Sequence, residues 1–326
     1  MKPGFNEDGL VLADRYSETM NGVVLPFLHR AVRPVTVKGA GEKPIACYRY
    51  DTEGSRGTVM IVHGFTECAE KFSELIFSLI QQGYSVLALD QRGHGASWRD
   101  EKISDLSLTS VNRFEDYVED LESVCDQELS AMPRPRYVFS HSMGGAVTCM
   151  LLENHPGIFE KAVFCAPMIA PARGGLPMWT SQALCLGAKA LGMSRSRIFI
   201  SKPFSGPEDF ETSCASGKER FAWYDELRVA TERYHNNGPT YGWTLESLRV
   251  TKKLLAPGKP ERITIPALIY TAEDDHSVLA EAQEQLVQRL LKGERRLVPG
   301  SRHEIYRSPD RVLYPWWHEI LSFFAS

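Results

Sequence analysis

Several features that mark specialised classes of protein are missing from the sequence. No apolar run approaches the roughly 18 residues of a membrane-spanning helix, and residues 1–8 lack the apolar core of a signal peptide. The seven cysteines include no C-x-x-C pair of the kind that binds zinc. A net charge of -4 gives no reason to propose nucleic acid as a partner.

What remains is the composition of a globular protein. Of the 326 residues, 43% are hydrophobic and 24% are charged, which suffices to bury a large core. An odd number of cysteines, with Cys149 and Cys165 in apolar runs, suits a reducing compartment. We therefore expect a cytoplasmic protein, and a peripheral position at the inner face of the membrane is compatible with the sequence. No feature specifies an oligomeric state.

Apolar runs alternate with helical patterns along the chain. The runs predict strands at residues 35–37, 45–50, 58–62, 85–89, 137–139, 161–166, 267–270 and 296–298. Apolar residues at helical spacing predict helices at 72–80, 111–125, 143–154, 281–291 and 312–324. The first two strands are predicted to form an antiparallel hairpin at a sheet edge. This alternation predicts an α/β fold with a mostly parallel central sheet flanked by helices.

The pattern changes between the two halves of this alternation. Strands stop, and glycine, proline and aromatic residues are scattered between short helical stretches. We interpret residues 167–260 as an inserted, mainly helical cap and residues 35–166 and 261–326 as the core. Residues 1–34 would be an N-terminal extension that packs on this core. Because ligands bind at the carboxyl ends of parallel strands, the polar loops after the strands should converge on one edge.

The stretch from Arg136 to Ala146 has the order strand, sharp turn, helix, with Ser142 at the turn. In a nucleophile elbow of this kind the backbone of the serine is strained, so the residues two before and two after it must be small. Ser140 and Gly144 meet that need. We predict that Ser142 is a nucleophile, and the alternative is an ordinary serine that caps a helix.

A serine hydroxyl needs a base to take its proton and an acid to orient that base. In this architecture the acid and then the histidine follow the serine along the chain. The loop after the last strand contains His303, the predicted base, and the loop after the preceding strand contains three acids. We favour Asp275, because Val278 should turn back onto the sheet and leave it at the loop apex. Asp274 and Glu273 stay open as alternatives.

The tetrahedral intermediate of acyl transfer needs two backbone donors. We expect these to be the amide of Met143, directly after the nucleophile, and the amide of Phe65, in the loop after the strand at 58–62. The glycines of residues 90–97 lack the G-x-G-x-x-G spacing of a dinucleotide site. We therefore expect no cofactor and no metal ion.

Together these segments resemble the α/β-hydrolase superfamily and, within it, the group of lysophospholipase L2 and the monoacylglycerol lipases. The resemblance covers roughly residues 35–325. It rests on His63-Gly64-Phe65-Thr66-Glu67, the run 89–97, the run 140–145, Gly300-Ser301-Arg302-His303 and the cap run 238–243. It implies a triad of Ser142, Asp275 and His303 and substrates with one acyl chain linked to glycerol. The acid of this family commonly precedes a valine by three residues, which favours Asp275.

The resulting hypothesis is a cofactor-independent serine hydrolase that cleaves lysophospholipids or monoacylglycerols through an acyl-enzyme. Further candidates for substrate contact are His63, His141, Tyr241 and Trp243, with an orienting role favoured for His63. The expected partner is a small lipid ester, and transient contact with a membrane surface is compatible with the hypothesis. Two alternatives stay open: a general carboxylesterase for short and medium chains, and a catalytically silent hydrolase-fold protein that binds a ligand or partner.

Overall fold

A computed structural model of the protein describes residues 3–172 and 175–326. Residues 1–2 of the expected N-terminal extension and residues 173–174 of the expected cap lie outside the described residues. The strands are β1 (Arg33–Lys38), β2 (Pro44–Tyr50), β3 (Thr58–Val62), β4 (Ser85–Leu89), β5 (Leu108–Thr109), β6 (Arg136–His141), β7 (Lys161–Cys165), β8 (Gly238–Pro239), β9 (Ala267–Asp274) and β10 (Gly293–Arg302). The helices are α1 (Tyr16–Thr19), α2 (Leu25–Ala31), α3 (Ser73–Gln81), α4 (Glu115–Gln127), α5 (Met143–Asn154), α6 (Met178–Ala190), α7 (Lys218–Ala230), α8 (Tyr241–Leu254), α9 (Ala280–Val287) and α10 (Asp310–Ala325).

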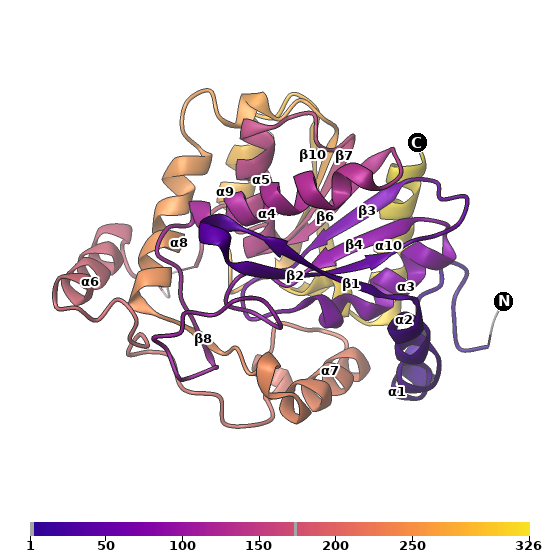
Figure 1. Ribbon diagram of the computed structural model, residues 1–326, viewed down its shortest axis with the longest axis horizontal. Helices are drawn as coiled ribbons and strands as arrows, with labels where there is room; N and C mark the ends of the chain where they lie inside the picture. The colour runs from indigo at the N-terminus through magenta and orange to yellow at the C-terminus, as the bar shows by residue number, and fades with distance from the viewer. Residues whose placement is uncertain (1–2, 173–174) are drawn as a thin grey trace.

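In the described part of the chain, eight strands form one central sheet in the order β1-β2-β4-β3-β6-β7-β9-β10 (Figure 1). All neighbouring pairs from β4 to β10 are parallel, whereas β2 is antiparallel to both β1 and β4. The structure thus confirms the predicted, mostly parallel sheet. It also confirms the antiparallel hairpin at one of its edges.

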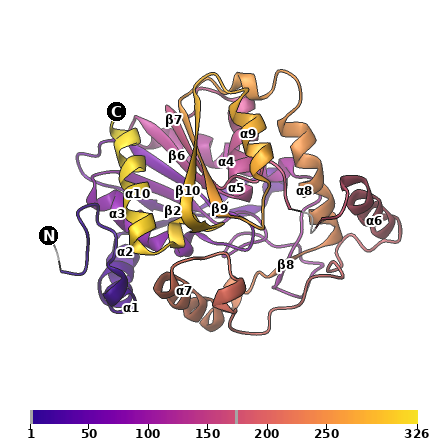
Figure 2. The same cartoon turned by 180° about the vertical axis from the view of Figure 1, so that it is seen from behind.

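Two layers of helices cover the faces of the sheet (Figures 1 and 2). Val59 and Ile61 of β3 pack on the side of α3 and α10, and Met60 and Val62 pack on the side of α4, α5 and α9. Every residue of β3 and β4 is buried. Strands covered on both faces need apolar side chains at consecutive positions, which explains the continuous apolar runs in the sequence.

The N-terminal segment packs on the face that carries α3 and α10. The ring of Phe5 stacks on that of Phe77 in α3, with centroids 5.1 Å apart. Leu10, Val11 and Met20 are fully buried in the same core. These contacts make residues 3–31 part of the packed body of the protein.

Three helices, α6, α7 and α8, lie between β7 and β9 in the chain and cover the loops at one end of the sheet. Figure 1 shows α6 at the outer end of the molecule, well separated from α7. The two-residue strand β8 pairs with β5, which belongs to the loop between β4 and α4. This region is mainly helical, as the loss of the strand pattern predicts.

The last two sheet strands are longer than the sequence predicts. β9 continues to Asp274 and β10 to Arg302, beyond the predicted ends at residues 270 and 298. The pairing continues with a shift in register between Val298 and Arg302. The apolar pattern stops earlier because these strand ends leave the core, and the last two residues of β9 are exposed. As a result, Asp275 and His303 each directly follow a strand.

Candidate active site

Ser142 lies in the turn between the end of β6 and the start of α5. Its backbone has φ 50° and ψ -118°, a conformation that costs a non-glycine residue on the order of 1–3 kcal/mol. Two hydrogen bonds hold it there. The amide of Ser142 donates to the carbonyl of Cys165 at 3.0 Å, and its carbonyl accepts from the amide of Met168 at 2.9 Å. The strain predicted for this turn is therefore present.

Close packing around the turn requires glycine at two positions. A Cβ atom on Gly144 would lie 2.3 Å from the carbonyl oxygen of Val62, and one on Gly64 would lie 2.9 Å from the Cβ of Ser142. Neither distance is tolerated by real side chains. Gly144 lets α5 approach β3, and Gly64 lets the loop after β3 approach the serine.

A chain of hydrogen bonds joins three side chains at the carboxyl ends of the strands. The Nε2 atom of His303 lies 2.9 Å from Ser142 Oγ, and its Nδ1 atom lies 2.7 Å from Asp275 Oδ2. The amides of Ser277 and Val278 donate to Asp275 Oδ1 at 2.8 and 3.1 Å. Burial raises the pKa of Asp275, but the hydrogen bond and charge of His303 and these two amides outweigh burial and hold that pKa below 3.8.

The two other acids of the loop have different partners. Asp274 is exposed and pairs with the exposed His276 at 3.1 Å. The carboxylate of Glu273 accepts from the amide of Gly300 at 2.8 Å. Of the three acids that the sequence left open, the structure brings Asp275 to His303.

Two backbone amides beside Ser142 are available as donors. Met143 is the first residue of α5, so its N–H group has no acceptor within the helix. Among the described residues, the amide of Phe65 donates to no protein group, whereas the amides on either side of it are both bound to side chains. A developing oxyanion on a substrate bound at Ser142 would find donors of the required kind here.

A buried ionic network lies directly behind the turn. Glu67 Oε2 accepts from the amide of Gly64 at 2.5 Å and lies 2.8 Å from Nδ1 of His141. Glu67 Oε1 accepts from the hydroxyl of Tyr306 at 2.5 Å and lies 3.2 Å from Nζ of Lys71. Burial raises the pKa of Glu67, but the charges of His141 and Lys71 outweigh burial and hold it well below its usual value.

The surroundings of His141 favour protons on both of its ring nitrogens. Its Nδ1 atom faces the carboxylate of Glu67, and its Nε2 atom lies 3.2 Å from the carbonyl oxygen of His303. An ionised Glu67 and a carbonyl group can only accept, so this arrangement favours the imidazolium form, in which both ring nitrogens donate. Burial lowers the pKa of His141, but the charge of Glu67 outweighs burial and raises it above 6.5. His141 directly precedes the nucleophile Ser142, so this contact links the nucleophile turn to the main chain of His303.

The sequence indicates no role for Glu67, and it suggests His63 and His141 as candidates for substrate contact. The two histidines are 0% and 1% exposed, and each is bound through both ring nitrogens. Neither therefore offers a surface to substrate in this structure, and both hold loops in place, as favoured for His63. The pair Glu67 and His141 is separated by 74 positions, so no local pattern could have joined them.

The two cap candidates, Tyr241 and Trp243, both lie in α8 and are buried. The ring of Trp243 packs on that of Phe65 with centroids 4.0 Å apart, and its Nε1 donates to the hydroxyl of Tyr117 at 3.2 Å. Trp243 therefore supports the loop that carries the Phe65 amide. Tyr241 packs in a small cluster with Leu245 of the same helix and with Cys185 and Ala188 of α6.

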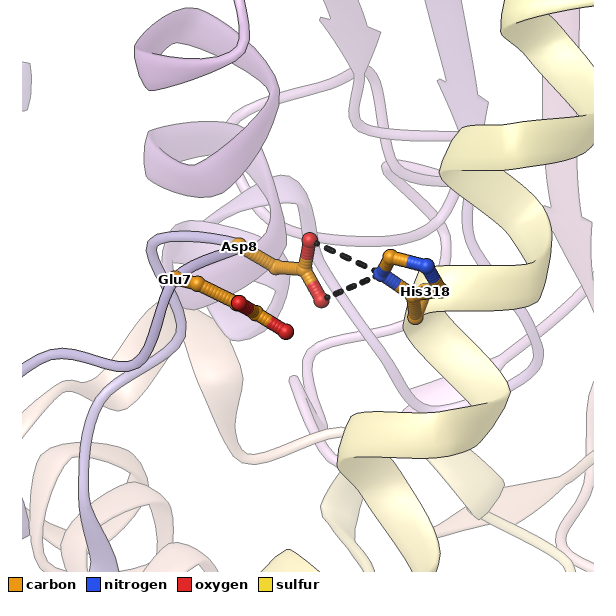
Figure 3. Close-up of side chains that lie close together, drawn as sticks. All are labelled: Glu7, Asp8 and His318. Carbon is orange, nitrogen blue, oxygen red and sulfur yellow. Dashed lines mark hydrogen bonds and ion pairs between the residues drawn. The ribbon is translucent and has the colours of Figure 1, made fainter.

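Within residues 3–172 and 175–326, one group of three side chains has the composition of a metal site. These are Glu7, Asp8 and His318, whose ligand atoms lie within 4.8 Å of one another (Figure 3). The carboxylate oxygens of Asp8 lie 3.2 and 3.3 Å from Nδ1 of His318. This ion pair joins the N-terminal segment to α10 and belongs to their packing rather than to the site around Ser142.

Comparison with known proteins gives one family match and several relatives. The model of the family described as serine aminopeptidase, S33, matches residues 53–310. Lysophospholipase L2 of Escherichia coli (strain K12) is 28% identical over 295 residues, which cover 88% of this chain and 85% of that protein. Monoacylglycerol lipase of Mycolicibacterium smegmatis is 25% identical over 262 residues, which cover 79% of this chain and 85% of that protein.

Solved structures extend the comparison to the fold. A soluble variant of monoglyceride lipase from Saccharomyces cerevisiae superimposes with a TM-score of 0.67 at 18% identity, covering 90% of this chain and 96% of the other. A carboxyl esterase from Bacillus coagulans superimposes with a TM-score of 0.70 at 18% identity, covering 90% and 98%. At these identities the likeness shows the fold alone.

Proposed function

Because the chain belongs to the serine aminopeptidase S33 family and has the α/β-hydrolase fold that the sequence predicted, we propose that it is a serine hydrolase of single-chain lipid esters. Its substrates would be lysophospholipids or monoacylglycerols. The observation that carries this proposal is the hydrogen-bonded chain from Asp275 through His303 to Ser142 at a strained turn. The names of the two relatives that match most of the chain support the lipid class.

The first half of the proposed reaction forms a tetrahedral intermediate. Ser142 Oγ attacks the carbonyl carbon of the ester while its proton passes to Nε2 of His303. Asp275 holds the ring in position and stabilises the imidazolium. The negative charge that develops on the carbonyl oxygen is bound by the amides of Phe65 and Met143.

The second half releases both products. The tetrahedral intermediate collapses as the bond to the leaving alcohol breaks, and His303 returns its proton to the alcohol oxygen. The acyl chain is then bound to Ser142. A water molecule gives a proton to His303 and attacks the acyl carbon, the bond to Ser142 Oγ breaks, and the proton restores the serine hydroxyl. These steps require no cofactor.

A test compares matched variants on one lipid. The wild-type protein should hydrolyse 1-palmitoyl lysophosphatidylcholine or monopalmitoylglycerol. Ser142→Ala should lower kcat/KM at least ~1000-fold, and Asp275→Asn should lower it strongly. Asp274→Asn is the matched control, since Asp274 is adjacent but exposed and bonded to His276, and it should retain activity. Nearly full activity of Ser142→Ala would overturn the proposal.

Two further outcomes separate the alternatives. Faster hydrolysis of four-carbon than of sixteen-carbon esters, with no lysophospholipid turnover, would identify a general carboxylesterase. A folded protein that turns over no ester and does not react with a fluorophosphonate would be a binding protein with a silent site. Hydrolysis of aminoacyl anilides in place of esters would identify a peptidase, as the family description names.

The membrane contact considered from the sequence is part of the same proposal. Of the twelve exposed large apolar side chains of the described residues, eight lie in residues 176–200, on α6 and the segments beside it; we call them the cap patch. Residues 161–207 contain six lysines and arginines and no aspartate or glutamate. Apolar side chains within a cationic segment suit a surface of anionic phospholipid, where single-chain lipid substrates also lie. Among the described residues, no helix has the length and apolar character needed to cross a membrane.

The proposal also includes a location and a division of the chain. All seven cysteines lie in the described residues and are free thiols, which suits the reducing cytoplasm. The protein would then act at the inner face of the membrane. Residues 167–260 would form the cap, residues 35–166 and 261–326 the core, and residues 1–34 the extension.

A further inference from the structure

The loop that carries the Phe65 amide has a strained backbone of its own. Thr66, the next residue, has φ 61°, a left-handed conformation that a β-branched residue keeps only where its surroundings hold it. A bond from outside the loop supplies that support, because the amide of Thr66 donates to Nε2 of His94 at 3.1 Å. Within the loop, the hydroxyl of Thr66 donates to the carbonyl of Phe65 at 2.7 Å.

His94 accepts this bond as a neutral ring with one proton. The amide of Thr66 is a donor, so Nε2 of His94 carries no proton. The Nδ1 atom lies 3.0 Å from the carbonyl oxygen of Arg92, which can only accept, so the proton is on Nδ1. Burial lowers the pKa of His94 well below 6.5, and the charges of His63 and Arg99 act in the same direction. The ring is therefore neutral at pH 7.

The glycine-rich run 90–97 fixes the place of His94, which is 0% exposed. The run turns around the carboxylate of Asp90, whose Oδ2 atom accepts from the amide of Ala96 at 2.8 Å. Gly95 lies in this turn with φ 50°, and a Cβ atom on it would lie 2.0 Å from Asp90 Oδ2. Glycine is therefore required beside His94, which gives the histidine a rigid support.

A second histidine holds the other side of Phe65. Nδ1 of His63 lies 2.7 Å from the carbonyl oxygen of Gly64, and its Nε2 accepts from the amide of Gln91 at 2.8 Å. The carbonyl of Gly64 and the amide of Phe65 belong to one planar trans peptide group, so they point in opposite directions. The bond from His63 therefore sets the direction of the Phe65 amide. The bond to His94 fixes the peptide group on the far side of the Phe65 Cα atom.

We propose that His94 is a positioning residue for the oxyanion donor, the amide of Phe65. It acts through the amide of Thr66. Without this bond, Thr66 leaves its left-handed conformation, and the Phe65 amide turns away from the oxygen on which charge develops. This inference rests on the proposed function, since it concerns the oxyanion of the same reaction.

Two substitutions of His94 separate positioning from a general role in folding. The side-chain amide of asparagine takes the place of Nδ1, so His94→Asn keeps a donor for the Arg92 carbonyl but does not reach the Thr66 amide. The side-chain oxygen of glutamine takes the place of Nε2, so His94→Gln keeps the acceptor for Thr66. On the palmitoyl ester that the wild-type protein hydrolyses, His94→Asn should lower kcat on the order of 100-fold with little change in KM, the effect of losing one oxyanion donor. His94→Gln should stay within about tenfold of wild type, because its acceptor replaces Nε2.

Two inhibitors show whether the loss belongs to the oxyanion. With a hexadecyl trifluoromethyl ketone, Ser142 Oγ adds to the carbonyl carbon, its proton passes to His303, and the carbonyl oxygen becomes an anion that needs the two amides. The ether 1-O-hexadecylglycerol has no carbonyl and reports binding without an oxyanion. His94→Asn should weaken the ketone on the order of 100-fold and change the ether by less than about twofold. Equal weakening of both inhibitors, wild-type kcat in His94→Asn, or equal losses in the two variants would overturn the inference.

A measurement on the wild-type protein applies if neither variant folds. Nitrogen-15 NMR of protein labelled at histidine reports which ring nitrogens carry protons. We expect His94 to have a proton on Nδ1 and none on Nε2 at pH 7, and a proton on Nε2 would overturn the inference. The proposed function fails separately, if wild-type protein hydrolyses no ester. If esters are hydrolysed and His94→Asn keeps the wild-type kcat, the proposed function stands and this inference fails.

Discussion

His141 is the residue on which the geometry of the candidate site depends most directly. Its side chain donates to Glu67, which also holds the amide of Gly64, and to the carbonyl of His303. His141 therefore joins the turn that carries Ser142, the loop that carries the Phe65 amide, and the main chain of His303. We infer that it is a positioning residue, since it acts on the reacting atoms through these neighbours.

His141→Asn should lower kcat on the order of 100-fold with little change in KM. Asparagine can still donate to Glu67 but cannot reach the carbonyl of His303, and small displacements of a base cost about that factor. His155→Asn is the matched control, because His155 pairs with Glu122 at a half-exposed position on the surface. A rise in KM with unchanged kcat would contradict the positioning role.

The same residue predicts a pH dependence. The pKa of His141 is raised above 6.5 in the folded protein, so the stabilisation from its charge is complete below pH 6.5 and is lost as the pH rises through the raised pKa. The wild-type kcat should fall as the pH rises through this raised pKa. The profile of His141→Asn should lack this step, and an unchanged profile in the variant would show that another group titrates.

At the scale of elements, the two outer cap helices differ in how they are held. Arg220 of α7 is 1% exposed and donates to Glu74 of α3 at 2.9 Å, to Asp310 of α10 at 2.7 Å and to the carbonyl of Val11 at 2.8 Å. These bonds fasten α7 to the core and to the N-terminal segment. The exposed apolar residues of the cap patch instead belong to α6 and the segments beside it.

Arg220→Met should lower the free energy of unfolding by about 3–5 kcal/mol, because it leaves the buried carboxylate of Glu74 without its partner. Chemical denaturation followed by tryptophan fluorescence measures this change. Arg113→Met removes an exposed arginine that pairs with Asp116 and Glu119, and it should change the stability by less than about 1 kcal/mol. Equal effects of both substitutions would show that the buried contacts do not hold α7.

The cap patch predicts binding to vesicles that contain anionic phospholipid. Leu191→Asn with Ile200→Asn should reduce co-sedimentation with such vesicles several-fold, since both side chains are more than 70% exposed in a segment without acidic residues. Leu291→Asn is the control, because this side chain is 73% exposed but lies outside the cap. Undiminished binding of the double variant would exclude the patch as the contact surface.

At the scale of the whole molecule, buried charged side chains between the cap and the core make the free energy of unfolding depend on pH in the acid range. Burial raises the pKa of Glu304, but the charges of Lys71 and Arg307 outweigh burial and lower it to about 2. A carboxylate with a depressed pKa contributes stability that is present above its ordinary value of 4.5 and is lost as the pH falls towards 2. The pKa of Glu67 is depressed in the same network.

The free energy of unfolding should therefore fall as the pH drops from 4.5 to 2, and Glu304→Gln should make this fall shallower. Denaturant unfolding at a series of pH values measures both slopes. The variant will be less stable than wild type at pH 7, because Lys71 and Arg307 lose their shared partner. Parallel pH profiles of the two proteins would show that Glu304 does not contribute to the acid response.

The sequence predicted the elements of this fold better than their long-range contacts. Buried parallel strands such as β3 and β4 require consecutive apolar residues, and the nucleophile turn requires small neighbours, so both leave local patterns. The ends of β9 and β10 leave the core and carry no such pattern. The contact between Glu67 and His141 and the hydrogen bond of Arg220 to Glu74 each join residues that are far apart in the chain. Only the folded structure reveals such contacts.

Labelling with an alkyl fluorophosphonate, followed by peptide mapping, tests whether Ser142 is the nucleophile of a serine hydrolase. We expect one phosphonylated residue in the wild-type protein, Ser142, with no labelling of Ser142→Ala and much slower labelling of His303→Ala. An absence of labelling in folded wild-type protein would contradict it. A label on another residue that persists in Ser142→Ala would contradict it equally.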